Sequence, residues 1–418
     1  MDKLRTDVVV VGGGTAGCFA AIAAAKAGAK TILVEKNGIL GGTITAAAVN
    51  FPGLFFAWGK QIIAGPCWES ILRAQSIGAA VIPEISRRPQ AHWHEQILLN
   101  IFSYTQILDE LCLESGVELR LHTMAAAVEE KDEHILLTAA QKEGLVQIEA
   151  AVLIDATGDA NVIRMAGYDC EKSDTLQPAT LINNIGGYQV ETIDREKIEK
   201  AVLEAYTNER LNPQDFQGKN LYDLLLEGRI SMHIECVDAE TSAGRTRLEI
   251  EARATLMRIV SFLREIPGLE NLRVISAAGE CGVRETCRII GEKTVTSEDY
   301  LAGKVYDDAV CYAFYPIDLH QPLGIKQIFL EEGVVPTIPY GALSPRGAKR
   351  LLAAGRCIAS DSDANSAIRV QAPCMAVGQA AGTAAAIAAR ENASVGSVPY
   401  HELKAALQNI GAIIPERE

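Results

Sequence analysis

The 418-residue chain has few aromatic residues, no Cys-x-x-Cys pair and no surplus of positive charge. Aromatic residues make up 6% of it, and its formal net charge is −14. This negative balance argues against nucleic acid and anionic membranes as partners, because like charges repel each other. The ten cysteines are scattered and lack the spacing of a zinc ribbon or an iron–sulfur ligand run, so we expect reduced thiols and no bound metal.

The chain also lacks a long uninterrupted apolar run. Residues 8–34 are interrupted by glycines and by Lys26 and Lys30, so they do not predict a membrane span. The first residues show no signal-peptide pattern, and we therefore expect a cytoplasmic location. Glycine is plentiful, with 35 residues, and 48% of the chain is hydrophobic. This composition, at this length, is typical of an α/β enzyme with two or three domains.

Three glycines near the N-terminus separate a strand-like run from an alanine-rich segment. Residues 7–11 are apolar and β-branched, as in a strand buried on both faces, and Gly12, Gly14 and Gly17 follow. In this pattern the first glycine permits a tight turn, the second lets the backbone approach a diphosphate, and the third lets the helix pack on the strand. Glu35 ends the next predicted strand, where a carboxylate can accept hydrogen bonds from a ribose. The order of strand, helix, strand and acid predicts a dinucleotide-binding domain.

The hydrophobic pattern predicts further elements of the same domain. Helical spacing of apolar residues covers residues 93–115, and residues 117–121 alternate as a strand. After them we expect an antiparallel meander and then a separate buried strand. The meander strands are residues 125–130, 134–140 and 146–151, and the buried strand with its polar turn is residues 152–159.

The middle of the chain differs in character from both ends. Short strands there alternate with predicted helices at residues 195–206, 220–228 and 246–266. A short apolar strand at residues 351–356 and a glycine- and alanine-rich helix at residues 371–390 then return to the first pattern. We therefore expect a nucleotide-binding domain made of residues 1–168 and 338–418, and an inserted substrate domain of residues 169–337.

These segments together resemble a known family. The resemblance covers nearly the whole chain and includes the glycine fingerprint with Glu35, the motifs DATGD (155–159), GVRETCRIIGE (282–292), YPIDLH (315–320) and AGR (354–356), and residues 368–382. The chain resembles the FAD-dependent oxidoreductases of the glutathione-reductase-type fold and is similar to the flavoprotein core of heterodisulfide reductase. The resemblance implies a three-layer α/β fold with a parallel sheet, helices and a β-meander, plus an inserted α+β domain.

The resemblance also implies which residues bind FAD. The glycine loop would hold the diphosphate, Glu35 the adenosine ribose, and Gly355 and Arg356 would lie near the ribityl chain. The helix that starts near Gln371 would point its N-terminus at the flavin, where charge develops on reduction. The full set is Gly12, Gly14, Thr15, Ala16, Gly17, Glu35, Lys36, Gly41, Gly42, Thr43, Ala126, Thr157, Gly158, Asp159, Gly355, Arg356 and Gln371.

Five polar residues are candidates for catalysis or substrate binding. Arg284, Glu285 and Arg288 form one polar run, in which guanidinium groups would clamp a carboxylate or phosphate, or form an internal ion pair between the domains. His320 is a candidate proton donor or acceptor, with a structural histidine as the alternative. Arg369 precedes the flavin-facing helix and would supply positive charge or bind substrate, or else cap the helix.

Two further features predict no chemistry. Cys281 and Cys287 lack the spacing of a redox-active pair and are expected to be buried thiols. His92 and His94 flank Trp93, but without a third ligand an interface or surface role is expected. The family pattern has an arginine where this chain has Cys287, so one potential anion contact is missing or replaced.

We therefore expect an FAD-dependent oxidoreductase that transfers a hydride between a small polar substrate and flavin N5, with anionic molecules among the candidate substrates. Only one dinucleotide fingerprint occurs, so no dedicated NAD(P) domain is predicted, and electrons come from the substrate, a redox partner protein or a transient nicotinamide. One alternative is a flavin-binding electron-transfer subunit of a larger complex, without its own substrate pocket. Another is a non-redox enzyme that keeps FAD as a structural cofactor.

Overall fold

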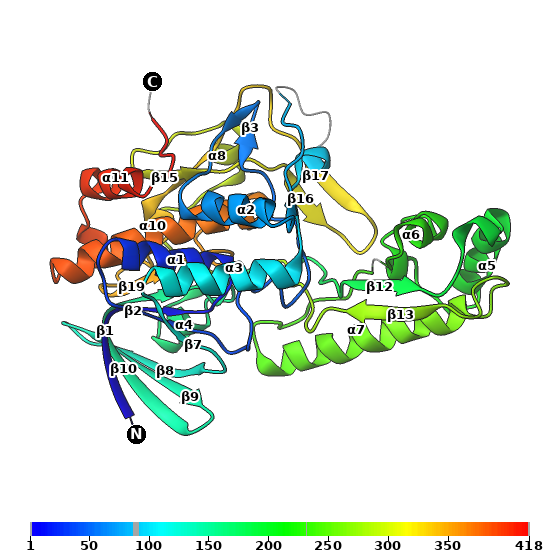
Figure 1. Ribbon diagram of the computed structural model, residues 1–418, viewed down its shortest axis with the longest axis horizontal. Coiled ribbons are helices and arrows are strands. Elements are labelled where there is room, and N and C mark those ends of the chain that lie inside the picture. Colours follow the sequence, from blue (N-terminus) through cyan, green and yellow to red (C-terminus); the bar gives the residue numbers. More distant parts are fainter. Residues whose placement is uncertain (1, 87–91, 231, 417–418) are drawn as a thin grey trace.

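The computed structural model describes residues 2–86, 92–230 and 232–416, and a seven-stranded sheet lies at its centre (Figure 1). The strands lie in the order β7, β2, β1, β10, β9, β8, and β19 pairs with β10 beside this path. Their bounds are β1 (Asp2–Val11), β2 (Thr31–Val34), β7 (Glu118–Arg120), β8 (Met124–Glu130), β9 (Ile135–Gln141), β10 (Gly144–Asp155) and β19 (Leu351–Ala353). β1 begins five residues before the predicted strand. Its last four residues and all of β2 are buried, which accounts for their unbroken apolar sequence.

One strand, β10, joins the parallel sheet to the meander. Residues 144–150 pair antiparallel with β9 and residues 153–155 pair parallel with β19, while β1 runs parallel along the other edge. The prediction of two strands, residues 146–151 and 152–159, is therefore wrong. Burial alternates over residues 146–151 and is continuous over residues 152–155, so the sequence pattern changes with the environment within a single strand.

Helices cover one side of this sheet. In Figure 1, α1 (Thr15–Lys26), α3 (Ile101–Glu114) and α10 (Gln371–Arg390) lie on one side of β1 and β2, and the strands β8 and β9 extend away from these helices. A Cβ atom at Gly378 would lie 2.2 Å from the carbonyl oxygen of Ala16, so glycine allows α10 to approach α1 closely. α10 is long and apolar enough to cross a membrane by composition alone, but 94% of its most apolar window is buried inside the protein.

The helix expected over residues 93–115 starts later than predicted. Residues 92–95 form a separate 3₁₀ turn, and α3 begins at Ile101 because the side chain of Asn100 accepts a hydrogen bond from the backbone N–H of Ser103 at 3.0 Å. The strand predicted at residues 117–121 is confirmed as β7, and the helix predicted at residues 371–390 is confirmed as α10.

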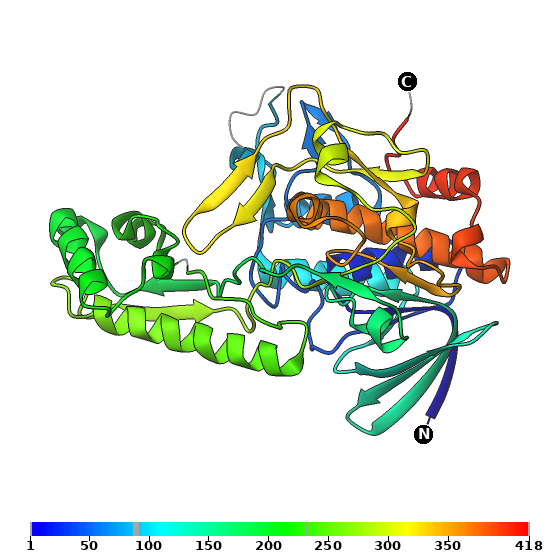
Figure 2. The same cartoon turned by 180° about the vertical axis from the view of Figure 1, so that it is seen from behind.

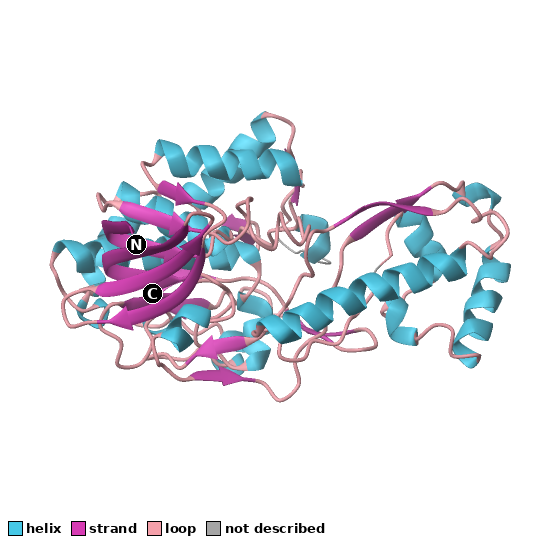
Figure 3. Cartoon of the chain, turned by 90° about the horizontal axis from the view of Figure 1, so that it is seen from below, coloured by secondary structure: helices cyan, strands magenta, loops and turns pink. Residues whose placement is uncertain are grey.

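A second core lies in an elongated lobe beside the sheet (Figures 1 and 2). Its buried hydrophobic residues run from Ala179 to Val283 and are separate from the cluster that surrounds the sheet. The lobe contains β12 (Asn183–Gly186), α5 (Arg195–Thr207), α6 (Leu221–Glu227), α7 (Ser242–Leu263) and β13 (Arg273–Ala277). Figure 3 shows α7 running from the sheet body out along the lobe.

The segment after the lobe returns to the first core. Hydrophobic residues from Cys287 to Ile338 pack in the cluster around the sheet, so the predicted substrate domain of residues 169–337 divides between the two clusters. The domain boundaries themselves stay a prediction. The elements of this segment are β14 (Cys287–Ile289), α8 (Ser297–Leu301), β15 (Ala309–Tyr312), β16 (Ile317–His320), β17 (Ile325–Ile328) and β18 (Thr337–Pro339).

The remaining elements are short and lie in the connections. The helices are α2 (Pro66–Ser76), α4 (Asn161–Met165), α9 (Ser362–Ile368) and α11 (Tyr400–Asn409). The strands are β3 (Phe56–Ala57), β4 (Lys60–Gln61), β5 (Ala80–Val81), β6 (Leu98–Leu99) and β11 (Cys170–Lys172). The predicted α/β class with a parallel sheet is confirmed.

Candidate functional site

A cavity of about 900 Å³ opens where the strands of the sheet end. Its wall includes Gly12, Glu35, Ala156 and Ala354, which directly follow β1, β2, β10 and β19. The start of α7, the segment around β16 and the start of α10 supply the other walls. In doubly wound sheets ligands bind at this edge, and cofactor sites reach volumes of about 1,000 Å³.

The glycine loop is shaped by close backbone contacts. Gly12 has a φ of +104°, and a Cβ atom there would lie 2.5 Å from the carbonyl oxygen of Ala156. A Cβ atom at Gly17 would lie 1.8 Å from the carbonyl oxygen of Gly12, whereas one at Gly14 would have no neighbour within 4 Å among the described residues. Gly14 therefore leaves its space open to the cavity. The described residues supply no side-chain cap to α1, so its first N–H groups fit a diphosphate.

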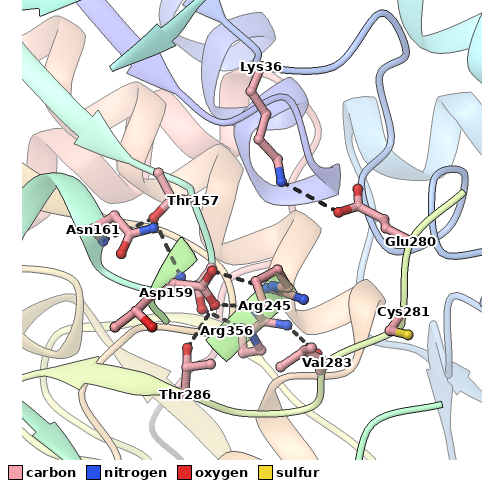
Figure 4. Close-up of polar contacts among 12 residues, drawn as sticks. Lys36, Thr157, Asp159, Asn161, Arg245, Glu280, Cys281, Val283, Thr286 and Arg356 are labelled. Carbon is pink, nitrogen blue, oxygen red and sulfur yellow. Dashed lines mark hydrogen bonds and ion pairs between the residues drawn. The ribbon is translucent and has the colours of Figure 1, made fainter. Parts of the chain in front are cut away.

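Glu35 is fixed by the backbone at the end of β2. Its Oε2 accepts a hydrogen bond from the Gly13 N–H at 2.6 Å, and its Oε1 accepts one from the Asn37 N–H at 2.7 Å. Burial raises the pKa of this carboxyl, and the two backbone hydrogen bonds oppose that shift. Lys36 next to it forms an ion pair with Glu280 at 3.4 Å (Figure 4).

The polar turn after β10 is organised by two aspartates. Asp155 accepts hydrogen bonds from the N–H groups of Thr157, Val162 and Ile163 at 2.8–3.0 Å, which fixes the turn against the start of α4. Asp159 accepts a hydrogen bond from Thr286 Oγ1 at 2.8 Å.

Arg356 fixes the same turn from the opposite side. Its guanidinium donates to Asp159 Oδ1 at 2.5 Å, to the Gly158 carbonyl at 2.8 Å and to the carbonyl of Val283 (Figure 4). Arg356 therefore ties the return strand to this turn and to the segment that leaves the lobe.

Most of the predicted cofactor residues lie on the cavity wall. Those that line it are Gly12, Gly14, Thr15, Ala16, Glu35, Lys36, Gly42, Thr43, Thr157, Gly158, Asp159, Gly355, Arg356 and Gln371. Within the described residues, the wall does not include Gly17, Gly41 or Ala126. Ala126 is exposed at an irregularity of the β8–β9 pairing, and its neighbour Ala125 lines the cavity instead.

Glu285 and Arg288 do not reach the cavity, which corrects their predicted place at the site. Both are buried, with a relative exposure of 1% and 4%, and their side chains form an ion pair at 3.6 Å. Glu285 accepts hydrogen bonds from Gln177 N–H and Ser362 Oγ, and Arg288 donates to the carbonyl of Ser360. The geometry fits the alternative for these two residues, an internal ion pair.

Arg284 and Arg369 do line the cavity. Arg284 donates to the Pro178 carbonyl at 2.5 Å and to Thr180 Oγ1 at 3.0 Å, and Arg369 donates to Gln177 Oε1 at 3.3 Å. In the part of the chain that the structure describes, the Nε of Arg369 has no hydrogen-bond partner, and neither arginine forms an ion pair with a carboxylate. Burial, with the nearby charge of Arg369, lowers the pKa of Arg284 to about 9.

His320 is the middle member of a hydrogen-bonded chain. Its Nε2 lies 3.1 Å from Asp318 Oδ2, and its Nδ1 lies 3.1 Å from Nε2 of His233, which belongs to the lobe. Burial and the charge of Arg284 lower the pKa of His320 to about 3 against the effect of Asp318, and they lower that of His233 to about 4. With both imidazoles neutral, His320 donates to Asp318 and accepts from His233.

Several residues of this site were missed by the sequence analysis. Asp318 lies two residues before His320 and on the same side of β16, so the period of a strand was an available signal. Gln177, His233 and Arg245 come from distant loops or from the lobe, and no local pattern marks them. Tyr315, whose hydroxyl accepts a hydrogen bond from Gln96 at 3.0 Å, lies at the start of the YPIDLH motif.

Among the described residues, the cysteines and histidines outside the hydrogen-bonded chain of Asp318, His320 and His233 form no metal site. Cys281 and Cys287 are confirmed as buried free thiols, and burial raises the pKa of both. Among the described residues, no group of three or more potential metal ligands occurs. The side chains of His92 and Trp93 lie outside the described residues.

The cavity at the strand ends, with an open helix start and a ribose-side acid, defines a dinucleotide-binding protein of the α/β class. The sequence matches the family described as "FAD dependent oxidoreductase" over residues 7–407, and the chain belongs to that family. It is therefore an oxidoreductase that uses FAD, as predicted.

Known proteins match smaller parts of the chain. Fumarate reductase (cytochrome) of Shewanella frigidimarina is 51% identical over 55 residues, which are 13% of this chain and 9% of that protein. Digeranylgeranylglycerophospholipid reductase 1 of Methanosphaera stadtmanae is 24% identical over 165 residues, or 38% of this chain and 40% of that protein. The chain thus covers less than half of either relative.

Solved structures resemble the whole chain more loosely. A geranylgeranyl bacteriochlorophyll reductase-like protein of Thermoplasma acidophilum is 15% identical to this chain, with a TM-score of 0.47. The match covers 98% of this chain and 83% of that protein. The p-nitrophenol 4-monooxygenase PnpA of Pseudomonas putida is 13% identical to this chain, with a TM-score of 0.44. The match covers 98% of this chain and 87% of that protein.

Proposed function

We propose that this enzyme transfers a hydride between a small carboxylate-bearing organic substrate and N5 of FAD. The observation that carries the proposal is the pair of cavity-lining arginines, Arg284 and Arg369, which bind neutral oxygens and form no carboxylate ion pair within the described chain. A desolvated guanidinium is costly unless it meets an anion, and its planar fork matches a carboxylate. The substrate carboxylate is the anion that we assign to this place.

The residues around the cavity divide the work between cofactor and substrate. Gly12, Gly14 and Glu35 would hold the diphosphate and ribose, and the first turn of α10, at Gln371, would face the flavin. When bound, FAD supplies hydride transfer at N5 and leaves negative charge on the ring, which a helix N-terminus and a nearby cation stabilise. Arg369 lies two residues before this helix and lines the cavity, so it would serve both the ring and the substrate.

The hydrogen-bonded chain of Asp318, His320 and His233 would handle the proton that the substrate loses or gains together with the hydride. Both ring nitrogens of His320 are engaged, so His320 would not exchange a proton with the substrate itself. Its Nε2–H donates to the Asp318 carboxylate, which would accept the proton that the substrate releases with the hydride, or return it in the reverse reaction. Asp318 lines the cavity, and the Gln327 side chain holds its Oδ1 at 2.8 Å. In this proposal the carboxylate of Asp318 is the group nearest the substrate.

The proposal also covers the protein's relatives, its cellular location and its partner. From the motifs alone, we propose that the chain is related to flavoproteins of the glutathione-reductase type, including the flavoprotein core of heterodisulfide reductase. We also propose a cytoplasmic location and a small-molecule partner.

An anaerobic screen tests the proposed function. The holoenzyme is mixed with small hydroxy and unsaturated carboxylates and with their amide or ester analogues, and flavin absorbance is followed in the oxidised and the pre-reduced enzyme. We expect one carboxylate to bleach or restore the flavin, and its uncharged analogue to react at least a hundredfold more slowly. Equal rates for both would overturn the carboxylate assignment, and turnover with only a redox protein would favour an electron-transfer subunit.

A further inference from the structure

One cation on the cofactor side of the cavity is supplied by the lobe. Arg245 lies on the first turn of α7 and lines the cavity together with Thr241 and Ser242. Thr241 caps the helix by accepting a hydrogen bond from the Gly244 N–H at 3.0 Å. A Cβ atom at Gly244 would lie 2.0 Å from the carbonyl oxygen of Asp238, so this turn is tightly packed and Arg245 is held at a defined place.

Arg245 has one weak partner among the described residues. Its Nη2 lies 3.3 Å from Asp159 Oδ2, while Asp159 Oδ1 already accepts hydrogen bonds from Arg356 at 2.5 Å and from Thr286 at 2.8 Å (Figure 4). Its side chain is 23% exposed, and that of Asp159 is 11% exposed. Burial alone would raise the pKa of Asp159, but the charges of Arg356 and Arg245 hold it below its usual value. One carboxylate thus faces two guanidinium groups, which leaves one positive charge without a counterion in this group.

The excess charge lies beside the turn expected to meet the cofactor's phosphates. Asp159 follows Thr157 and Gly158, which line the cavity with Gly12 and Gly14. A second lobe residue, Glu280, pairs with Lys36 at the edge of the same cavity (Figure 4). The cofactor side is therefore bordered by the sheet body and by the lobe.

We infer that Arg245 binds the diphosphate of FAD, so that the lobe supplies one of the cofactor's ligands. A diphosphate carries negative charge, which would balance the positive charge that Asp159 leaves unpaired on Arg245 and Arg356. A guanidinium binds phosphate oxygens through paired hydrogen bonds. FAD then links the two hydrophobic cores. This inference concerns the cofactor alone and does not depend on the proposed substrate.

Affinity for cofactor fragments tests the inference on the full-length chain. FAD, ADP, adenosine and riboflavin are titrated into the parent protein and the Arg245→Ala variant, and dissociation constants are measured by fluorescence or calorimetry. We expect FAD and ADP to bind at least tenfold more weakly to the variant, and adenosine and riboflavin to change less than twofold. Affinities for FAD and ADP within twofold of the parent would overturn the inference, as would an equal loss for adenosine.

Two further variants control for structural damage. Arg247→Ala removes an arginine from the same helix whose side chain is 62% exposed and lies 3.8 Å from Asp238, and it should change FAD affinity less than twofold. Arg245→Gln can still donate to Asp159 but carries no charge, so it should lose affinity for FAD and ADP as Arg245→Ala does. Parental affinity in a folded Arg245→Gln protein would show that Arg245 acts only on Asp159.

Discussion

Two parts of the cavity wall differ in what forms them, and we call them the cofactor end and the substrate end after the ligands that we propose for each. At the cofactor end, the wall is mainly backbone: the turn at Gly12 and Gly14, the open start of α1 and the turn fixed by Asp155. At the substrate end, the wall consists of polar side chains, including Arg284, Asp318 and His320, drawn from separate segments. A backbone wall depends on local conformation, and a side-chain wall depends on tertiary packing.

A glycine substitution at the cofactor end should have the largest effect. In Gly17→Ala the new Cβ atom would lie 1.8 Å from the carbonyl oxygen of Gly12, so the strand, the turn and α1 must move apart. We expect a loss of about 3 kcal/mol or more in the free energy of unfolding, measured by chemical denaturation of the apoprotein.

Gly14→Ala is the matched control for this prediction. Its Cβ atom meets no described protein atom within 4 Å, so the apoprotein should keep its stability to within about 1 kcal/mol. FAD affinity should still fall, because the methyl group occupies space that the diphosphate needs. Equal stability losses in the two variants would remove the distinction between a packing glycine and a cofactor glycine.

At the substrate end, low pH should lower the stability of the protein through its buried histidines. In the unfolded chain the pKa of His233 is about 6.5, the ordinary value of a histidine. In the folded protein, burial and the charge of Arg284 lower this pKa to about 4. Between these values the unfolded state binds more protons, so stability falls as the pH drops. From about pH 7.5 to about pH 4.5, His233→Asn should lose about 2 kcal/mol less stability than the parent.

The exposed His401 offers a control for that measurement. His401→Asn makes the same substitution at an exposed position, and surface substitutions of this kind change stability by less than about 0.5 kcal/mol. The same acid loss in the parent and in His233→Asn would mean that the hydrogen-bonded chain of Asp318, His320 and His233 does not hold two neutral imidazoles.

The smallest effect is expected at the edge of the cavity. Lys36 and Glu280 form an ion pair at 3.4 Å, and the lysine side chain is 51% exposed. Solvent-screened pairs contribute little, so Lys36→Ala should change FAD affinity less than about threefold, measured by the same titration. A loss above tenfold would move Lys36 from the edge of the cavity into direct contact with the cofactor.

The sequence predicted the strands and the glycine turn of the cofactor end because local rules govern them. Gly12 and Gly17 need their small size because a Cβ atom there would meet the carbonyl oxygens of Ala156 and Gly12, and Gly14 leaves its space open. Unbroken apolar runs marked the two buried strands on either side of α1. The prediction of two strands in place of β10 also came from a local rule. A change in burial pattern looks like a break between two strands when the pairing partners are unknown.

The substrate end was predicted only in part. The polar run containing Arg284 was found, but its members separate: Arg284 faces the cavity, whereas Glu285 and Arg288 turn into the core. His233 and Arg245 belong to the lobe and meet the site only through tertiary packing, which leaves no signature in spacing.

Arg284 and Arg369 would form an anion site next to FAD, and the proposed function depends on that site. The most direct measurement is the flavin absorbance spectrum of the holoenzyme titrated with small mono- and dicarboxylates, compared with the Arg284→Gln/Arg369→Gln variant. We predict a saturable spectral change in the parent and none in the variant, with FAD retained by both. A parent spectrum that no carboxylate perturbs, or an equal change in the variant, would contradict this claim.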